Sequence, residues 1–232
     1  MSSATTINVL TPAVAPALTL DRVSRLYGSF AALREVSLTL PAGASVVLLG
    51  ENGAGKSTLL KLTAGLISPS YGSVSVFDHH PRNQRGRIGY MSHATQLYDE
   101  LTGQENLIYF ASLHGLSNPQ QAAAAALTAV ALDPANPRRV GEYSQGMKQR
   151  AALARTLLAE PDLLLLDEPF SNLDAASAHS MIDRLLAYLA AGPTRTLLLT
   201  THQAELARPL ARTTITLNAG RIASIVETGG PS

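Results

Sequence analysis

The chain has 232 residues, of which 46% are hydrophobic, and a formal net charge of +1. This length can bury the core of one compact domain, and the nearly balanced charge argues against a nucleic-acid partner. Because the sequence contains no cysteine, disulfides and thiolate metal sites are excluded, which fits the cytoplasm. No run of about 18 apolar residues occurs, so we expect the chain not to span a bilayer.

The two ends of the sequence differ from its interior. Residues 1–17 are rich in Ala, Thr, Pro and Val and lack the positive start of a signal peptide, so we expect a flexible tail there. Residues 228–232 are expected to form a second tail, which leaves 18–227 as a single domain. Within this domain, three strand-like segments are expected to form an antiparallel sheet: 18–23, 36–40 and 74–77.

A phosphate-binding loop is the clearest motif. Residues 50–58 read GENGAGKST, which fits G-x-x-x-x-G-K-[ST], and they lie between an apolar strand-like segment, 45–49, and a helix-like segment near Leu59. Glycines let the backbone turn tightly and direct N–H groups at phosphate oxygens, and the helix start adds partial positive charge. We therefore expect ATP to contact the whole loop: Gly50, Glu51, Asn52, Gly53, Ala54, Gly55, Lys56, Ser57 and Thr58.

Two side chains of this loop have distinct expected roles. Lys56 should reach the β- and γ-phosphates as a flexible cation. The hydroxyl of Ser57 should bind the Mg²⁺ ion that bridges these phosphates. ATP and Mg²⁺ are therefore the expected cofactors.

The next segment, from about 93 to 160, predicts a mostly helical subdomain, in which Ala122–Ala126 is a strong helix former. Ser144 precedes apolar residues at helical spacing and is expected to be the N-cap of a helix over 147–159. Such a helix start can bind an anion, although most capping serines bind nothing.

Four leucines, 163–166, predict a strand that is buried on both faces of a parallel sheet. Asp167 and Glu168 follow it, at the carboxyl end, where α/β proteins bind their ligands. Side chains alternate along a strand, so the two carboxylates can have different tasks. We assign Asp167 to Mg²⁺, through water, and Glu168 to the general base that polarises the attacking water.

The sequence resembles the ATP-binding cassette family, the ATPase subunits of ABC transporters. Three features carry the resemblance, in chain order: the phosphate-binding loop, the Tyr143–Met147 segment and the Asp167-Glu168 pair. The resemblance extends from about Leu18 to Ile225. It implies an α/β P-loop NTPase fold with a mixed or parallel core sheet, an antiparallel β-subdomain and a helical subdomain. It also implies an ATP hydrolase that works with integral membrane permease subunits, as a peripheral protein at the cytoplasmic face of the cell membrane.

The family's signature, usually LSGGQ, is replaced here by a segment in which Gln145 and Met147 differ from the usual residues, while Ser144 and Gly146 remain. The resemblance implies that Ser144, Gln145, Gly146 and Met147 contact ATP held by the loop of another cassette. It therefore implies a dimer of cassettes that closes on ATP and reopens after hydrolysis.

Three further residues each match one position of the family's pattern. Tyr27 resembles the aromatic residue that stacks on adenine. Asp174 resembles the residue of the loop that communicates between the two ATP sites, although an N-cap before the helix 175–189 explains it as well. His202, after the apolar strand 196–199, resembles the switch histidine that contacts the γ-phosphate, and we count it as catalytic.

One position departs from the family. A glutamine normally stands in the loop that enters the helical subdomain, and this sequence has His93 there. Because Mg²⁺ prefers hard oxygen ligands, His93 should act through water or a hydrogen bond, as a catalytic-site residue that couples to the membrane partner. Gln96 can take its place if the loop shifts.

The same stretch is similar to a subfamily. Tyr90–His93 and Leu97–Leu107 resemble the haem-exporter ATPase of cytochrome c maturation, which implies haem export for cytochrome c biogenesis. We expect no direct haem ligation, because an ATPase need not touch the cargo and His79, His80 and His114 are typical of surface histidines. Exporters of drugs, lipids or ions, and a soluble ABC ATPase of cofactor assembly, remain alternatives.

Overall fold

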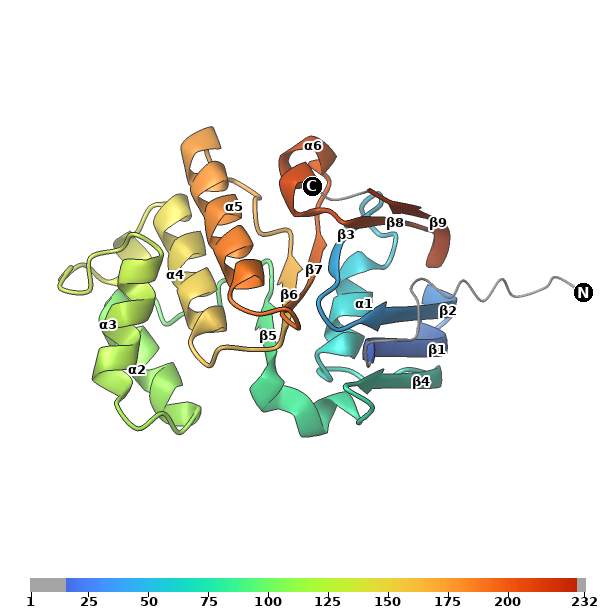
Figure 1. Cartoon of the computed structure of the whole chain (residues 1–232), viewed down its shortest axis with the longest axis horizontal. Helices are drawn as coiled ribbons and strands as arrows, with labels where there is room; N and C mark the ends of the chain where they lie inside the picture. The colour runs from blue at the N-terminus through green and yellow to red at the C-terminus, as the bar shows by residue number, and fades with distance from the viewer. Residues whose placement is uncertain (1–15, 229–232) are drawn as a thin grey trace, which may run out of the picture.

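The computed structural model describes residues 16–228, which form two β-sheets with helices on their faces and to one side (Figure 1). The larger sheet has the strand order β5-β6-β7-β3-β8-β9, and its neighbours are parallel except for the antiparallel edge pair β8-β9. The predicted mixed core sheet is therefore confirmed. Its strands are β3 (Ser45–Leu49), β5 (Ile88–Met91), β6 (Leu163–Asp167), β7 (Thr196–Thr200), β8 (Thr213–Asn218) and β9 (Arg221–Glu227).

The smaller sheet has the order β2-β1-β4 and is antiparallel throughout, as predicted. Its strands are β1 (Pro16–Tyr27), β2 (Phe30–Pro41) and β4 (Tyr71–Val76). β1 and β2 extend beyond the predicted segments because a two-residue turn joins them directly. β4 ends before Phe77, because the backbone of Phe77 and Asp78 is left-handed, with φ of 49° and 62°.

Three helices form a subdomain beside the larger sheet: α2 (Gly103–Leu113), α3 (Pro119–Ala129) and α4 (Gln145–Leu157) (Figure 1). The first of them begins ten residues later than the predicted helical segment, at a capping box made by Thr102 and Glu105. Helix α4 begins directly after its N-cap Ser144, two residues earlier than predicted. The remaining helical elements are α1 (Lys56–Thr63), α5 (Ala175–Ala190), α6 (Ala204–Ala207) and the 3₁₀ turns η1 (Pro81–Arg87), η2 (Val140–Glu142) and η3 (Arg208–Leu210).

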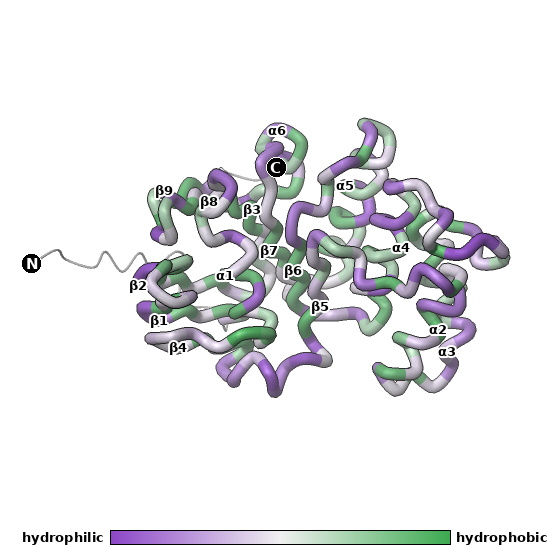
Figure 2. Tube along the Cα trace, turned by 180° about the vertical axis from the view of Figure 1, so that it is seen from behind, coloured by the Kyte–Doolittle hydropathy of each residue, from purple (hydrophilic) through white to green (hydrophobic). Residues whose placement is uncertain are grey.

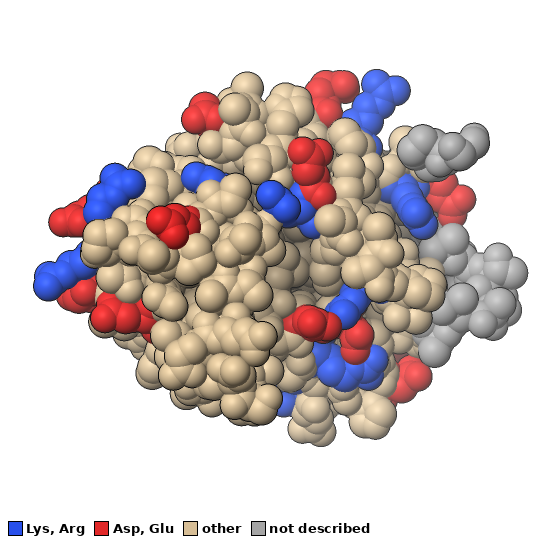
Figure 3. Space-filling model, turned by 60° about the vertical axis from the view of Figure 1, so that its left-hand side comes forward, with Lys and Arg blue, Asp and Glu red and all other residues tan. Residues whose placement is uncertain are grey.

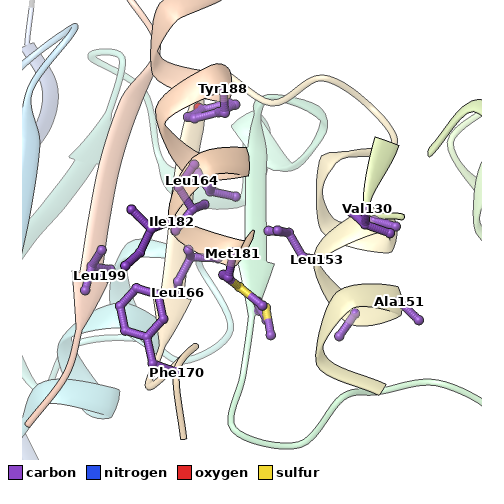
Figure 4. Packing of buried hydrophobic residues seen from close by; sticks show 14 of the residues in the cluster. Val130, Ala151, Leu153, Leu164, Leu166, Phe170, Met181, Ile182, Tyr188 and Leu199 are labelled. Atoms are coloured by element: carbon purple, nitrogen blue, oxygen red, sulfur yellow. The ribbon is translucent and has the colours of Figure 1, made fainter. Parts of the chain in front are cut away.

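The leucines of β6 divide between two hydrophobic clusters. Leu163 and Leu165 pack with the smaller sheet and α1, whereas Leu164 and Leu166 pack with α4 and α5. Figure 4 shows the second cluster, and Figure 2 shows hydrophobic residues along the central strands. All four side chains are fully buried, and each contributes roughly 2 kcal/mol of burial free energy. Burial on both faces fixes the strand that positions Asp167 and Glu168.

The two predicted tails differ from the structure at their inner ends. β1 begins at Pro16, and Ala17, which the sequence placed in the tail, is fully buried. At the other end, the backbone N–H of Thr228 donates to the carbonyl of Arg212 at 2.9 Å. The ordered domain therefore includes at least residues 16–228, and the rest of both predicted tails lies outside the described residues.

The surface of the described domain carries charges of both signs. On the face that carries α2, α3 and α4, acidic and basic side chains are interspersed (Figure 3). Of the helices in residues 16–228, none combines the length and the apolar character needed to cross a bilayer.

Candidate nucleotide-binding site

The candidate site lies at the carboxyl edge of the larger sheet, where β3, β6 and β7 end beside α1. Thr200 of β7 pairs in register with Leu48 on one side and with Asp167 on the other, so the residues after these strands lie together. A cavity of about 550 Å³ opens at this edge. It is lined by Gly50, Glu51, Asn52, Ser57, His93, Asp167, Glu168, Ser171 and His202.

Helix α1 begins at this cavity without a side-chain cap. The other helices of at least eight residues within 16–228 all have one, from Thr102, Asn118, Ser144 and Asp174. Because the first N–H groups of a helix have no intrahelical acceptor, the start of α1 offers donors and partial positive charge to an anion. Phosphate is the anion that such a start commonly binds.

Gly55 allows this helix start to lie against the smaller sheet. Its φ is 106°, and a Cβ atom at this position would lie 2.4 Å from the carbonyl oxygen of Ala32. A side chain is therefore excluded both by backbone conformation and by space.

Lys56 places a cation between the loop and the carboxylate of Glu168. Its Nζ donates to the carbonyls of Gly50 at 2.6 Å and Glu51 at 3.2 Å, and lies 3.8 Å from Oε1 of Glu168. The lysine is only 6% exposed. A buried ammonium needs acceptors, so the loop carbonyls hold it at a position where phosphate oxygens can replace them.

Asp167 forms an oxygen cluster with two hydroxyl groups. Its Oδ1 accepts hydrogen bonds from Ser57 Oγ at 3.0 Å and from Thr200 Oγ1 at 2.8 Å, in a buried position. Hydroxyl and carboxylate oxygens are ligands that Mg²⁺ prefers, and this ion commonly keeps waters and binds phosphate oxygens as well. Ser57 and Asp167 therefore fit the predicted ion and would hold it. Within residues 16–228 no group of three or more His, Cys, Asp or Glu side chains is placed to bind a metal.

Glu168 has a left-handed backbone, with φ of 52°, which is uncommon outside glycine. Its N–H donates to both the carbonyl and the hydroxyl of Thr200, at 3.1 and 3.0 Å, and these bonds hold the conformation. Its Oε2 lies 2.9 Å from Nδ1 of His202. A carboxylate fixed in this way over the cavity can accept a proton from water, which is the chemistry predicted for Glu168.

Tyr27 and Phe30 line a second cavity of about 260 Å³, which shares Glu51, Asn52, Ser57 and Glu168 with the first. The two aromatic residues are cross-strand partners at the tip of the β1–β2 hairpin, so their side chains lie on the same side. The guanidinium carbon of Arg25 lies 4.6 Å from the centre of the Tyr27 ring. One face of this ring is therefore occupied, and a planar base can stack on the other.

His93 and Gln96 occupy different environments. His93 lines the larger cavity. Gln96 instead accepts a hydrogen bond from Arg155 Nη1, at 3.0 Å. The structure therefore brings His93 to the cavity, and the loop would have to rearrange before Gln96 could take its place.

The signature segment lies outside both cavities. None of Ser144, Gln145, Gly146 and Met147 lines either one. Ser144 caps α4, because its Oγ accepts from the N–H of Met147 at 3.3 Å. A Cβ atom on Gly146 would lie 2.9 Å from Oγ of Ser177. The glycine thus allows the start of α4 to lie against α5.

Asp174 caps α5, and its Oδ1 accepts from the N–H of Ser177 at 2.7 Å. This backbone hydrogen bond lowers the pKa of the Asp174 carboxyl below its usual value. Gly146 and Asp174 therefore have Ser177 as a common neighbour. The structure brings the predicted signature and inter-site positions together, but not onto the phosphate-binding loop of the same chain.

Sequence reasoning missed three residues that shape the site. Thr200 forms hydrogen bonds with both Asp167 and Glu168. The sequence could have indicated this residue, because the strands that precede Asp167 and His202 are parallel neighbours. Phe30 shares the smaller cavity with Tyr27, and its signal is the short hairpin turn between them. Ser171 lines the larger cavity, and its chemistry gave no separate signal.

Comparison with known proteins gives a consistent result. A family model described as ABC transporter matches residues 33–171. The Nod factor export ATP-binding protein I of Rhizobium johnstonii is 37% identical over 211 residues, which cover 88% of this chain and 67% of that protein. The ABC transporter ATP-binding protein NatA of Bacillus subtilis is 38% identical over 199 residues, covering 82% of this chain and 80% of that protein.

Solved structures share the fold. The ATP-binding subunit of an ABC transporter superposes with a TM-score of 0.81 at 30% identity, over 91% of this chain and 90% of that one. A dimeric ATP-binding cassette bound to ADP and Pi, 24% identical, has a TM-score of 0.85 over 92% of this chain and all of that one.

The fold and the comparisons define a P-loop NTPase of the ABC ATPase type. This chain belongs to the ABC transporter family and is an ATP-hydrolysing cassette. The predicted ABC ATPase family and fold are therefore confirmed. None of the relatives described above is named as a haem exporter.

Proposed function

We propose that this chain binds and hydrolyses ATP to power export through integral membrane permease subunits. The observation that carries this proposal is the convergence of the uncapped α1 start, Lys56, the Ser57–Asp167 pair and the Glu168–His202 pair at one cavity. These groups can bind a phosphate chain with Mg²⁺ and accept a proton from water. The name of the Nod factor export relative supports the direction of transport.

A dimer of cassettes is part of the proposal. Ser144 and Gln145 are exposed, and the signature segment lies outside the cavities that hold the phosphate-binding loop. The capped start of α4 can meet the phosphates of ATP bound to a second chain, since a helix N-terminus favours anions. ATP would then bridge two chains, and its hydrolysis would weaken the bridge.

A surface near His93 supports a permease partner. Tyr98 and Tyr109 are 47% and 42% exposed, with ring centres 5.4 Å apart. Tyrosine is enriched in protein interfaces because it buries apolar area and keeps a polar end. We therefore propose that the permease contacts this face, and that the chain is a peripheral protein at the cytoplasmic face of the membrane.

The transported molecule is a finer proposal. Haem export for cytochrome c biogenesis is supported by the Tyr90–His93 and Leu97–Leu107 resemblance, with no haem ligand in this chain. The Nod factor export and NatA relatives support export by the family without pointing to haem. An exporter of another molecule is thus the second candidate, and the two share every residue of the ATP site.

Partner capture tests the proposal. A tagged Glu168→Gln variant would be purified with ATP from detergent-solubilised native membranes, beside a Glu205→Gln control, because Glu205 is an exposed carboxylate outside the cavities. Mass spectrometry should find multi-helix permease subunits enriched with Glu168→Gln. A haem spectrum and a haem-handling protein in the complex would support haem export, while a permease without them would exclude it. Soluble scaffold proteins alone would contradict the transporter proposal.

A further inference from the structure

We propose that Arg155 is a positioning residue that holds His93 at the catalytic cavity and ties it to the helix that begins at Ser144. This role is internal to one chain. It goes beyond the function proposed above and does not depend on the transported molecule or on the permease.

The guanidinium of Arg155 forms hydrogen bonds with both ends of the segment 90–96, and His93 is the middle residue of this segment. Its Nη1 donates to Oε1 of Gln96 at 3.0 Å, and its Nη2 donates to the carbonyl of Tyr90, also at 3.0 Å. Tyr90 lies three residues before His93 and Gln96 three residues after it. One side chain therefore holds both ends of the segment that presents His93 to the cavity.

Arginine suits this position better than lysine. Its planar guanidinium directs several N–H donors in fixed directions and can bind two acceptors at once, whereas a lysine ammonium is a compact point charge. The Arg155 side chain is partly buried, and its Cζ lies 5.3 Å from the centre of the Phe110 ring. Burial lowers the pKa of this guanidinium, but its ordinary value is so high that the group stays charged.

The backbone of the segment needs such a support. Gln96 has φ of 54°, a left-handed conformation that is uncommon for residues other than glycine. Conformations of this kind persist when surrounding contacts hold them. The hydrogen bond from Arg155 supplies one of these contacts at Gln96 itself.

A second attachment, three residues beyond this segment, ties the chain to the other end of α4. Lys148 Nζ lies 3.3 Å from Oδ1 of Asp99, whose carbonyl accepts from the N–H of Gly141 at 2.9 Å. Lys148 and Arg155 are seven residues apart on α4, about 10 Å along its axis. Gln96 and Asp99 are three residues apart, which also spans about 10 Å in extended chain. The segment thus lies along α4, in the opposite direction.

The positions of His93 and Ser144 are consequently coupled through α4. α4 carries Ser144 at its N-terminus and Arg155 in its last turn, and the side chain of Arg155 reaches the segment around His93. A displacement of this segment moves the signature start, and closure at the signature start moves His93. The coupling needs no contact between the two residues.

The first test observes His93 directly. The protein has six histidines, so ¹³C labelling at histidine Cε1 gives a small set of NMR signals, and His93→Gln identifies the one from His93. We expect Gln96→Leu and Arg155→Lys to shift or broaden this signal. Gln84→Leu is the matched control, because Gln84 also accepts from an arginine Nη1, that of Arg87 at 3.5 Å, away from the cavity. An unchanged His93 signal, or an equal change in the control, would overturn the proposal.

The second test separates positioning from general stability. Gln96→Leu should lower kcat for ATP about three- to tenfold without changing KM, the effect of one hydrogen bond on the barrier. Gln96→Glu, which keeps an acceptor for Arg155, should restore kcat. In a His93→Ala background Gln96→Leu should have no further effect, because both changes act through His93. A full additional loss in that background would contradict the proposed role, and so would an unchanged kcat in the wild-type background.

Discussion

Two helix starts in this molecule are both expected to bind phosphate, and their structures differ. The start of α1 has no side-chain cap and opens into the cavity that Asp167 and Glu168 also line. The start of α4 is capped by Ser144, and residues 144–147 line neither cavity. One chain therefore gathers Lys56, Asp167 and Glu168 at the first start, whereas the second start lies outside the cavities that these residues line.

The two helix starts divide the site into two halves, one at the start of α1 and the other at the start of α4. Lys56 and Asp167 are buried and held by hydrogen bonds, so this half of the site is preorganised. Ser144 is exposed, and its Oγ accepts from the N–H of Met147 at 3.3 Å, so its O–H group can donate elsewhere.

Glu168→Gln should break the chemistry of the first half and leave the second intact. The amide keeps the shape of the side chain but cannot accept the proton, so we expect kcat to fall roughly 10²- to 10⁴-fold. ATP affinity should be retained, and size-exclusion chromatography with ATP should show a stable dimer. The exposed Glu205→Gln is the control and should hydrolyse ATP normally. Steady-state hydrolysis equal to wild type would show that Glu168 is not the base.

Lys56→Ala should break nucleotide binding itself. Removal of a buried cation that faces the phosphate-binding loop should weaken ATP binding about 100-fold, the order expected for charge-assisted hydrogen bonds. Isothermal titration calorimetry would measure this affinity. Lys61→Ala is the control, because Lys61 is exposed on the same helix, α1. Comparable losses in both variants would indicate a general effect of helix charge rather than a phosphate contact.

Gly146→Ala tests the second half. The new Cβ would lie 2.9 Å from Oγ of Ser177, so either the Ser177 side chain or the start of α4 must shift, at a cost of about 1–3 kcal/mol. We expect ATP-driven dimerisation to weaken about tenfold while the affinity of the monomer for ATP is unchanged.

A second substitution sharpens this result. Ser177→Ala removes the clashing oxygen and leaves its Cβ at 3.5 Å, an ordinary contact, so the double variant should regain most of the dimer affinity. Analytical ultracentrifugation with ATP would measure it. Failure of the double variant to recover would mean that the spacing between α4 and α5 does not control the signature.

The sequence predicted the first half better than the second because its signals are local. The phosphate-binding loop is one continuous motif, and the apolar strand before Asp167 places the carboxylates at the correct edge of the sheet. The predicted helix start at Ser144 was also located within the correct turn. Each of these depends on neighbouring residues along the chain.

Contacts between distant segments could not be predicted in the same way. Thr200 meets Asp167 because two strands 33 residues apart are parallel neighbours, and Arg155 meets Gln96 across 59 residues. The predicted helical segment from residue 93 also failed over its first ten residues, because that stretch is held along α4 by side chains rather than by helical bonds. Pairing of this kind depends on the packed structure.

The smallest expected effect is at Tyr90, beside the catalytic half. Burial, together with the negative charge of Asp167, raises the pKa of the Tyr90 hydroxyl to about 12. In the unfolded chain tyrosine ionises near pH 10, so the folded protein keeps its proton over a range in which the unfolded chain loses it. The contribution of Tyr90 to stability is therefore complete below about pH 10 and is lost as the pH rises to about 12.

Tyr90→Phe should remove this dependence. The buried hydroxyl makes no hydrogen bond within residues 16–228, so its removal relieves a desolvation penalty and should raise the free energy of unfolding at pH 8 by up to about 1 kcal/mol. Between pH 10 and 12 the variant should lose less stability than wild type, as measured by urea unfolding. Equal losses in both proteins would mean that Asp167 and burial do not act on Tyr90.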